Sequence, residues 1–473
     1  MAVKVMTGQG GSEMNNRLPG VLGHLGFILC LVLSVFGEAT AQTLEDALTS
    51  AYRNNPTLLG QRAKVRATDE QVPQALSNWR PSIEITGSTG VNDNKNTTRS
   101  DRTQQREPKS IDLTVTQNLY RGGRTFAALR EADNTIRAER ARLLETEQDV
   151  LLNAATAYFD VFRDEAVLKL NINNEQVLKR NLEATRDRFE VGEITRTDVH
   201  QAEARLAGTV ADRIEAEGAL EASRATYLNI VGMPAPTTLV AAELPKGLPK
   251  SQEEVTMVAA VKNPSVISAE FDRLALKDNV DEIRGELLPS LSVSTGVSRK
   301  IQSAGEEGRI DSAELTLNLT VPLYQQGEVF SRLREAKQDV AEQIQVTDQT
   351  RRDAVEEATK AWKSLLTARA RVASFKTQID ANLVALEGVR REAQVGSRTV
   401  LDVLDAEQES LNSRVSHVSA QRDELLAVFE LKAAMGQLTA HELKLPVAAY
   451  DPIDNYQKVR DKWFGADNSG GTN

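Results

Sequence analysis

The sequence predicts an α+β membrane protein written as two copies of one unit, each with long coiled-coil helices and two strands of membrane-crossing length. Three observations lead to this fold class: an internal repeat, paired stretches with apolar residues at every second position, and two stretches of almost seventy residues nearly free of Gly and Pro. A chain of 473 residues with only 4% aromatic residues also suits long helices with thin cores.

The repeat is visible as matched residues at a constant spacing. Pro81-Ser82 recurs as Pro289-Ser290, and Leu119-Tyr120-x-x-Gly123 recurs as Leu323-Tyr324-x-x-Gly327. In the window 119–133, 8 of 15 residues are identical to those of 323–337, whereas chance gives about one. The offset changes from 208 to 204 between these two motifs, so a loop of different length is expected within 82–119.

The first 41 residues have the features of a cleaved secretory signal. Arg17 precedes an apolar run from Pro19 to Phe36, and Ala39-Thr40-Ala41 follows it, so cleavage is expected after Ala41. The alternative is a membrane anchor, but the run is short and contains three glycines and a histidine. The single cysteine, Cys30, lies inside this run, so the mature chain is expected to contain no disulfide and no thiolate metal cluster.

The strands are predicted from alternation of apolar and polar residues. Ile, Leu and Val alternate with Ser, Thr, Glu and Asn in 83–91 and 111–119, and again in 291–297 and 315–321. The polar segments Asn92 to Ser110 and Arg299 to Asp311 are expected to be surface loops. Strands of about ten residues can cross a bilayer, but four strands cannot close alone, so two chains for eight strands or three for twelve must share one sheet.

The long helices are predicted from a seven-residue apolar spacing. Leu129, Ile136, Leu143, Val150 and Ala157 recur at this spacing between Gly123 and Gly192, which indicates left-handed coiled-coil packing. Each long helix is expected to end at Val-Gly and to turn tightly into a returning helix. The predicted organisation begins with a signal peptide over 1–41 and ends with a C-terminal collar segment and tail over 447–473. The first repeat covers 42–249, with a short helix, β-hairpin 82–120, long helix 124–191 and return helix 195–231. The second repeat covers 250–446, with a short helix, β-hairpin 289–323, long helix 328–395 and return helix 399–435.

Composition excludes several functional classes. The formal net charge of -10 disfavours a nucleic-acid partner. The four histidines do not pair at metal-ligand spacing, and no nucleophile–base motif is visible, so neither a metal, a cofactor nor an enzymatic activity is expected. An ordinary periplasmic coiled-coil scaffold or adaptor without a pore is the alternative reading, although it leaves the four strands unexplained.

At this point the residues resemble the TolC family of outer-membrane efflux and type I secretion channels. The resemblance covers about 42 to 464, and its markers are the doubled strand motifs and the paired segments FEVGEITRTDVHQAE (189–203) and QVGSRTVLDVLDAEQ (394–408). It implies a homotrimer with a shared 12-stranded β-barrel in outer-membrane lipid and a helical barrel crossing the periplasm of a Gram-negative bacterium. The implied partners are a periplasmic adaptor (membrane fusion) protein and an inner-membrane pump or ABC transporter, and the segment 451–465 is similar to members that serve type I secretion.

The resemblance also implies a gate at the helix tips that opens by an iris-like movement. It places Arg398 opposite Thr197 and Asp198 as a clasp, and it makes Gly192 and Gly396 the turn formers of the periplasmic tips. An Arg presents the donor fork that a carboxylate needs. The family often has an aromatic residue where this chain has Ala393, which puts one further contact of the closed state in doubt.

Two acidic residues are candidates for the constriction itself. Asp402 and Asp405 are three apart on a helix and share a face, and three copies would form a cation-favouring ring. The alternative is a solvated coiled-coil face. Near the C-terminus, Trp463 and Phe464 could anchor at a membrane interface or pack in the collar, and packing is the favoured prediction.

Overall fold

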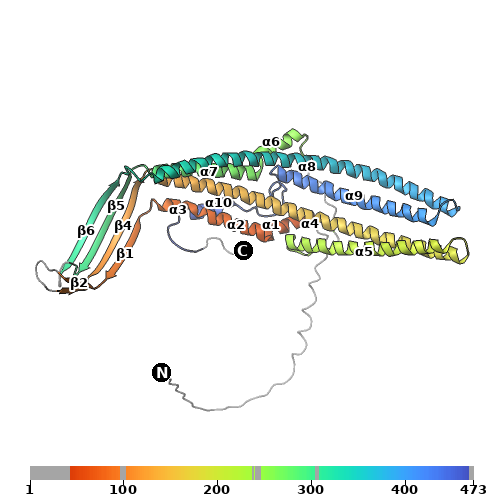
Figure 1. The fold of residues 1–473 in the computed structure, drawn as a ribbon, viewed down its shortest axis with the longest axis horizontal. Coiled ribbons are helices and arrows are strands. Elements are labelled where there is room, and N and C mark those ends of the chain that lie inside the picture. Colours follow the sequence, from red (N-terminus) through yellow and green to blue (C-terminus); the bar gives the residue numbers. More distant parts are fainter. Residues whose placement is uncertain (1–42, 96–102, 237–238, 240–246, 304–307, 468–473) are drawn as a thin grey trace, which may run out of the picture.

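A computed structural model describes residues 43–95, 103–236, 239, 247–303 and 308–467. The predicted signal peptide and its cleavage site lie outside these residues. The described chain is long and narrow, with a β-sheet at one end and two helical hairpin tips at the other (Figure 1).

The order of elements repeats in the two halves, with more helices before the first sheet strand than predicted. Three helices precede β1 and two precede β5, because Asn55-Pro56 and Asn263-Pro264 each end one helix and start the next. The bounds are α1 Leu44–Asn54, α2 Pro56–Asp69, α3 Gln71–Ser77, β1 Ser82–Thr89, β2 Asn92–Lys95, β3 Thr103–Arg106, β4 Lys109–Arg121, α4 Arg124–Glu190, α5 Arg196–Val231, α6 Gln252–Lys262, α7 Pro264–Gly285, β5 Ser290–Ile301, β6 Arg309–Thr320, α8 Glu328–Gln394, α9 Val400–Ala434 and α10 Pro452–Val459.

The four long strands form one antiparallel sheet in the order β1-β4-β5-β6. The predicted surface loops are shorter than expected, since β2 pairs with β3 inside 92–110, and β5 and β6 extend to Ile301 and Arg309. The ladder continues into polar sequence because its backbone hydrogen bonds do not depend on side-chain polarity.

Within the described chain, β1 and β6 each pair on one side only. Their apolar side chains are open to the surroundings: Ile83 and Ile85 on β1 are each 70% exposed, and Leu315 on β6 is 77% exposed. A sheet with two free edges and a bare apolar face requires cover from outside this chain.

The helices α4 and α8 contain 67 residues each, which corresponds to roughly 100 Å. The predicted heptad positions Ile136, Leu143, Val150 and Ala157 are buried, which confirms the coiled-coil prediction for α4. α5 returns along α4, and α9 returns along α8 (Figure 1). No helix in the described part of the chain has both the length and the apolar character needed to cross a membrane.

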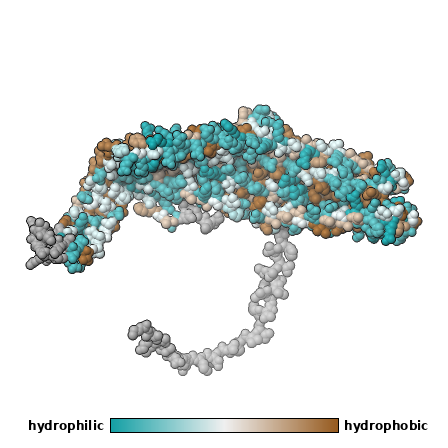
Figure 2. Space-filling view, in the orientation of Figure 1, coloured by the Kyte–Doolittle hydropathy of each residue, from teal (hydrophilic) through white to brown (hydrophobic). Residues whose placement is uncertain are grey.

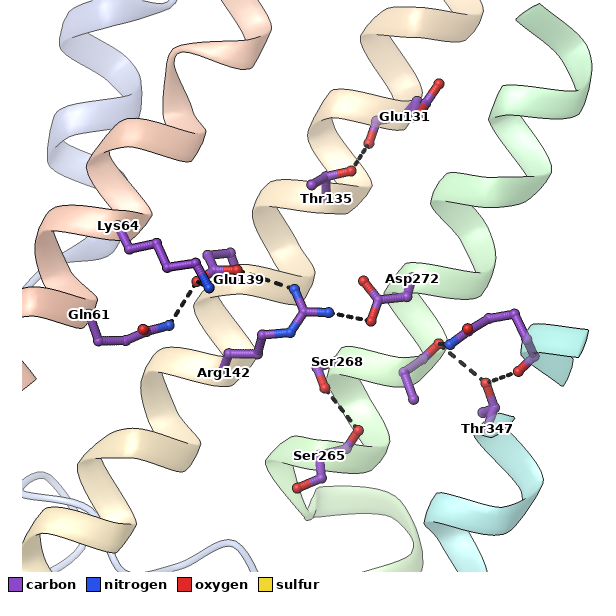
Figure 3. A network of polar contacts seen from close by, with 12 residues as sticks. Gln61, Lys64, Glu131, Thr135, Glu139, Arg142, Ser265, Ser268, Asp272 and Thr347 are labelled. Carbon is purple, nitrogen blue, oxygen red and sulfur yellow. Dashed lines mark hydrogen bonds and ion pairs between the residues drawn. The ribbon is translucent and has the colours of Figure 1, made fainter. Parts of the chain in front are cut away.

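Polar contacts hold the helices together between the sheet and the middle of the molecule. The carboxylate of Glu139 on α4 accepts from Gln61 on α2 at 2.7 Å and lies 3.0 Å from the ammonium of Lys64, while Arg142 pairs with both Glu139 and Asp272 on α7 (Figure 3). These contacts connect the two repeats through α4. Hydrophilic residues also predominate over the helices on the face shown in Figure 2.

The largest apolar core lies midway along the molecule. It joins α1, the middle of α4 and the end of α5 with residues that follow α9, among them Leu438 and Leu445. A second cluster packs α6 against α8 and α9, through Val255 and Ala259. These cores fix the base from which both hairpins extend.

Candidate functional site at the helical hairpin tips

The two hairpin tips are built alike. Gly192 lies in the turn after α4 with φ of 81°, and Gly396 lies in the turn after α8 with φ of 79°, a conformation that glycine adopts without steric cost. Thr195 and Thr399 then cap the return helices in capping boxes with Asp198 and Asp402. The carboxylates accept from the threonine N–H groups at 2.9 Å in both tips, so both turns are fixed by the same bonds.

A second pair of contacts also recurs in both hairpins. Arg186 on α4 pairs with Glu203 on α5 at 2.7 Å, and Arg390 on α8 pairs with Glu407 on α9. We call these two ion pairs the hairpin clamps. The hydrogen bond from Arg186 is the main cause that lowers the pKa of Glu203, so the carboxylate stays charged and the clamp persists at neutral pH.

The tips of the two repeats pack against each other. Leu178 and Leu182 on α4 and Val199 on α5 form one apolar cluster with Leu404 on α9. Beyond this cluster lies a hollow lined by residues of both tips, including Asp198 and Arg398. The tips therefore form one site to which both repeats contribute.

The structure brings two of the three predicted clasp residues, Arg398 and Asp198, to the same hollow, but within this chain they have other partners. The Arg398 Nε donates to Glu392 at 3.0 Å, and this bond is the main cause that raises the pKa of Arg398. The Asp198 carboxylate accepts from Thr195, and Thr197 is exposed in the first turn of α5. Contact between Arg398 and the Thr197/Asp198 pair stays a prediction.

The two acidic residues predicted to form a ring also differ in their partners. The Asp402 carboxylate caps α9, and its hydrogen bond from the Thr399 backbone is the main cause that lowers its pKa. Asp405 pairs with Arg205 on α5. The side chains of Arg205 and Asp405 are 42% and 56% exposed, so this pair remains open to solvent.

The Arg205–Asp405 pair joins the first repeat to the second, and the sequence reasoning missed it. A signal was present in the repeat: Asp405 corresponds to Gln201, and Arg205 corresponds to Glu409. Charged residues that differ between equivalent positions cannot serve a contact that both hairpins share. They are therefore candidates for contacts between the hairpins.

The site supplies charge pairs, helix caps and an apolar cluster, which suit mechanical coupling of helices. Among the described residues, no group of three or more His, Cys, Asp or Glu side chains could hold a metal. A sheet with membrane-length strands at one end and paired helix tips at the other defines a class of protein, the outer-membrane channel with a periplasmic helical duct.

The chain belongs to the outer membrane efflux protein family, whose sequence profile matches residues 47–232 and 257–437. The two matched segments coincide with the two repeats. The predicted resemblance to the TolC family is confirmed, and the protein is an outer-membrane channel protein and not an enzyme.

Individual relatives cover nearly the whole chain. The outer membrane efflux protein BepC of Brucella suis is 33% identical over 90% of this chain and 92% of its own length. The proteases secretion protein PrtF of Dickeya chrysanthemi is 24% identical over 88% of this chain and 93% of its own length. The crystal structure of the Campylobacter jejuni CmeC outer membrane channel has the same fold, with a TM-score of 0.75 at 16% identity, over 88% of this chain and 89% of that chain.

Proposed function

We propose that the chain acts as a homotrimeric exit duct for a multidrug efflux pump, a type I protein secretion system or both. The observation that carries this proposal is the four-stranded sheet, with an unpaired β1 edge, an unpaired β6 edge and an exposed apolar face. Pairing β6 of one copy with β1 of the next removes both edges. Three copies would then give a closed 12-stranded barrel, the arrangement that the family resemblance implies.

The partners follow from the position of the tips. The sheet and the tips lie at opposite ends of the long helices, so tips attached to a sheet in the outer membrane would extend far across the periplasm. A periplasmic adaptor and an inner-membrane pump or ABC transporter would contact the tips there and supply the energy. The relatives BepC and PrtF support efflux and protein secretion as the two candidate tasks.

The gate is proposed to be the ring of hairpin tips. In the closed trimer, Arg398 would contact Thr197 and Asp198 of an adjacent tip, and Asp402 and Asp405 would surround the opening. Arg398 and Asp198 line one hollow. This supports the proposal that a small movement of the tips lets both residues leave their present partners. The glycine turns at Gly192 and Gly396 keep each tip compact while the hairpins move.

A periplasmic scaffold without a pore is the rival function, and the exposed strand residues argue against it. A scaffold surrounded by water would leave Ile83, Ile85, Leu315 and Leu317 uncovered on one face.

The test is the mass of the detergent-purified protein and its conductance in a planar bilayer, for wild type and Arg398→Ala. We expect a trimer and an open probability raised several-fold by the substitution. The matched control is Arg391→Ala, because Arg391 is also a tip arginine but pairs with Glu387 one turn away on its own helix. A folded monomer that never inserts would refute the channel, whereas equal opening in wild type and Arg398→Ala would refute the clasp alone.

A further inference from the structure

The residues after α9 form a segment, here called the C-terminal strap (residues 437–464), that runs back along the first repeat. Its backbone N–H at Ala440 donates to Glu147 at 2.7 Å, and its backbone N–H at Tyr450 donates to the hydroxyl of Tyr52 at 3.0 Å. Further on, α10 packs against α2 (Figure 1). The strap thus leaves the central core and follows the helices toward the sheet.

Side chains of α10 hold the strap in place by specific bonds. The Asn455 amide donates to the buried carboxylate of Asp69 at 2.9 Å, and the Tyr456 hydroxyl donates to Asp133 at 2.8 Å. Val459 is 1% exposed. The position of the strap is therefore set by these contacts as far as the end of α10.

The strap ends where the first membrane-length strand begins. The Arg80 guanidinium donates to the carbonyl of Lys462 at 2.7 Å and lies 4.8 Å from the ring centroid of Trp463. Arg80 is separated from the start of β1 at Ser82 by Pro81 alone. Two distant parts of the sequence therefore meet at the junction between helix and sheet.

Within the described chain, the aromatic rings at the end of the strap are mostly exposed, so packing of Trp463 and Phe464 in the collar stays a prediction. Trp463 is 58% exposed and Phe464 is 87% exposed. Asn455 and Val459 are the buried residues of α10. The rings of Trp463 and Phe464 follow α10 in the chain and are not buried with them.

Other aromatic residues lie at the same junction. Trp79 contacts Phe126 edge-on with ring centroids 4.3 Å apart, and Phe126 and Tyr120 are 55% and 48% exposed. Aromatic rings with neighbouring cations are typical of the boundary between lipid and water, where the ring enters the headgroup region and the charge meets phosphate. Arg80 provides such a cation beside Trp463.

We propose that Trp463 and Phe464 enter the headgroup region of the periplasmic leaflet of the outer membrane and anchor the C-terminal strap to phospholipid. Phospholipid is the favoured occupant because the exposed apolar face of β1 starts at Ile83, three residues after Arg80. The strap would then fix the depth of β1 in the bilayer. This inference rests on the outer-membrane location and does not require a trimer or a gate.

The test uses Trp463 as its own fluorescent probe. The chain has three tryptophans, Trp79, Trp362 and Trp463, so Trp79→Phe with Trp362→Phe leaves Trp463 alone. The matched control, Trp79→Phe with Trp463→Phe, leaves Trp362, which packs against the α6 cluster far from the sheet. Both full-length mature proteins are reconstituted in phosphatidylcholine vesicles with or without brominated acyl chains, and iodide is added separately as an aqueous quencher.

We expect brominated lipid to reduce Trp463 emission about twofold and to leave Trp362 emission unchanged. Strong quenching of Trp463 by iodide without quenching by brominated lipid would place the ring in the periplasm and overturn the proposal. Protection from both quenchers would also overturn it, because the ring would then be covered by protein, such as a second copy of the chain. Thermal unfolding followed by circular dichroism checks that both reconstituted variants are folded.

Discussion

The two repeats share the contacts that hold each helical hairpin together, and they differ in the residues through which the two hairpins face each other. Both hairpins have the Thr–Asp capping box, and both have an Arg–Glu clamp at equivalent positions 204 residues apart. The tips differ where Arg398 replaces Ile194 and where Asp405 replaces Gln201. Duplication has thus retained what each hairpin needs to fold, while the contacts between hairpins have become specific to one copy.

The repeats also differ in how well they are covered. In the first, α1, α2 and the C-terminal strap pack over α4, whereas in the second, Leu323 and Tyr324 at the sheet exit are 93% and 79% exposed. Tyr120, the first-repeat equivalent of Tyr324, is only 48% exposed. The less covered repeat is the one that most needs a neighbouring copy or lipid.

The largest effect is expected from the pair that joins the two repeats. Arg205→Asp places a second carboxylate beside Asp405, and like-charge repulsion should separate the tips and raise the open probability about fivefold in planar bilayers. The exchanged variant, Arg205→Asp with Asp405→Arg, restores opposite charges and should return the channel toward wild type. If the exchanged variant opens as often as Arg205→Asp, the pair does not hold the tips together.

The hairpin clamps should differ in strength although they are equivalent in sequence. The side chain of Glu407 is 8% exposed and that of Glu203 is 39% exposed, so solvent screens the first-repeat clamp more strongly. Glu407→Ala should cost about 1–2 kcal/mol of unfolding free energy, and Glu203→Ala should cost less. Thermal unfolding of the two variants measures the difference, and an equal loss would show that burial does not distinguish the clamps.

A smaller effect on stability is expected at the two helix junctions, Asn55-Pro56 and Asn263-Pro264. The Asn263 amide donates to the Ala434 carbonyl at 3.2 Å, and the Asn55 amide donates to the Ile230 carbonyl at 3.0 Å. Because Asn263 is buried, Asn263→Ala should cost about 1–2 kcal/mol, and Asn55→Ala should cost less. Asn263→Asp keeps the helix cap but loses the amide donor, so chemical unfolding of this variant separates the two roles.

The smallest effect concerns pH. Burial raises the pKa of Glu147 above its usual value, so the folded state favours the protonated form, and the stability this gives is lost as pH rises through the folded-state pKa. Glu147→Gln should therefore flatten the stability profile above about pH 4, while the amide oxygen still accepts from Ala440.

The control for this prediction is Glu139→Gln, which should lower stability at neutral pH because Glu139 is the ion-pair partner of Lys64 and Arg142. Unfolding midpoints of wild type and both variants, measured between pH 4 and pH 8, test this prediction. A steeper profile for Glu147→Gln than for wild type would contradict the effect assigned to burial.

Local periodicity was sufficient to predict the strands and the long helices. The alternation at Ile83 and Ile85 and the heptad from Leu129 to Ala157 are properties of neighbouring residues, and both appear as expected. The extension of the first hairpin by β2 and β3 was missed, because composition alone favoured a loop. β2 and β3 pair as a separate two-stranded sheet, and both strands are polar throughout.

The site was harder to predict because its partners come from different repeats. The sequence identified Arg398, Asp402 and Asp405 as tip residues but did not show that Glu392, Thr399 and Arg205 would be their partners. The exposure of Trp463 and Phe464 depends on where the strap ends beside Arg80. Contacts over such distances are set by packing, which one sequence does not reveal.

The most direct test of the central claim, that the paired tips control a channel, is the ion selectivity of single channels in a planar bilayer. Wild type is compared with Asp402→Ala and Asp405→Ala combined, and capping of α9 is checked by thermal unfolding because Asp402 also holds Thr399. We expect small cation-selective openings in wild type and a loss of cation selectivity in the double variant. Openings of identical selectivity in both proteins would contradict control of the channel by these tips.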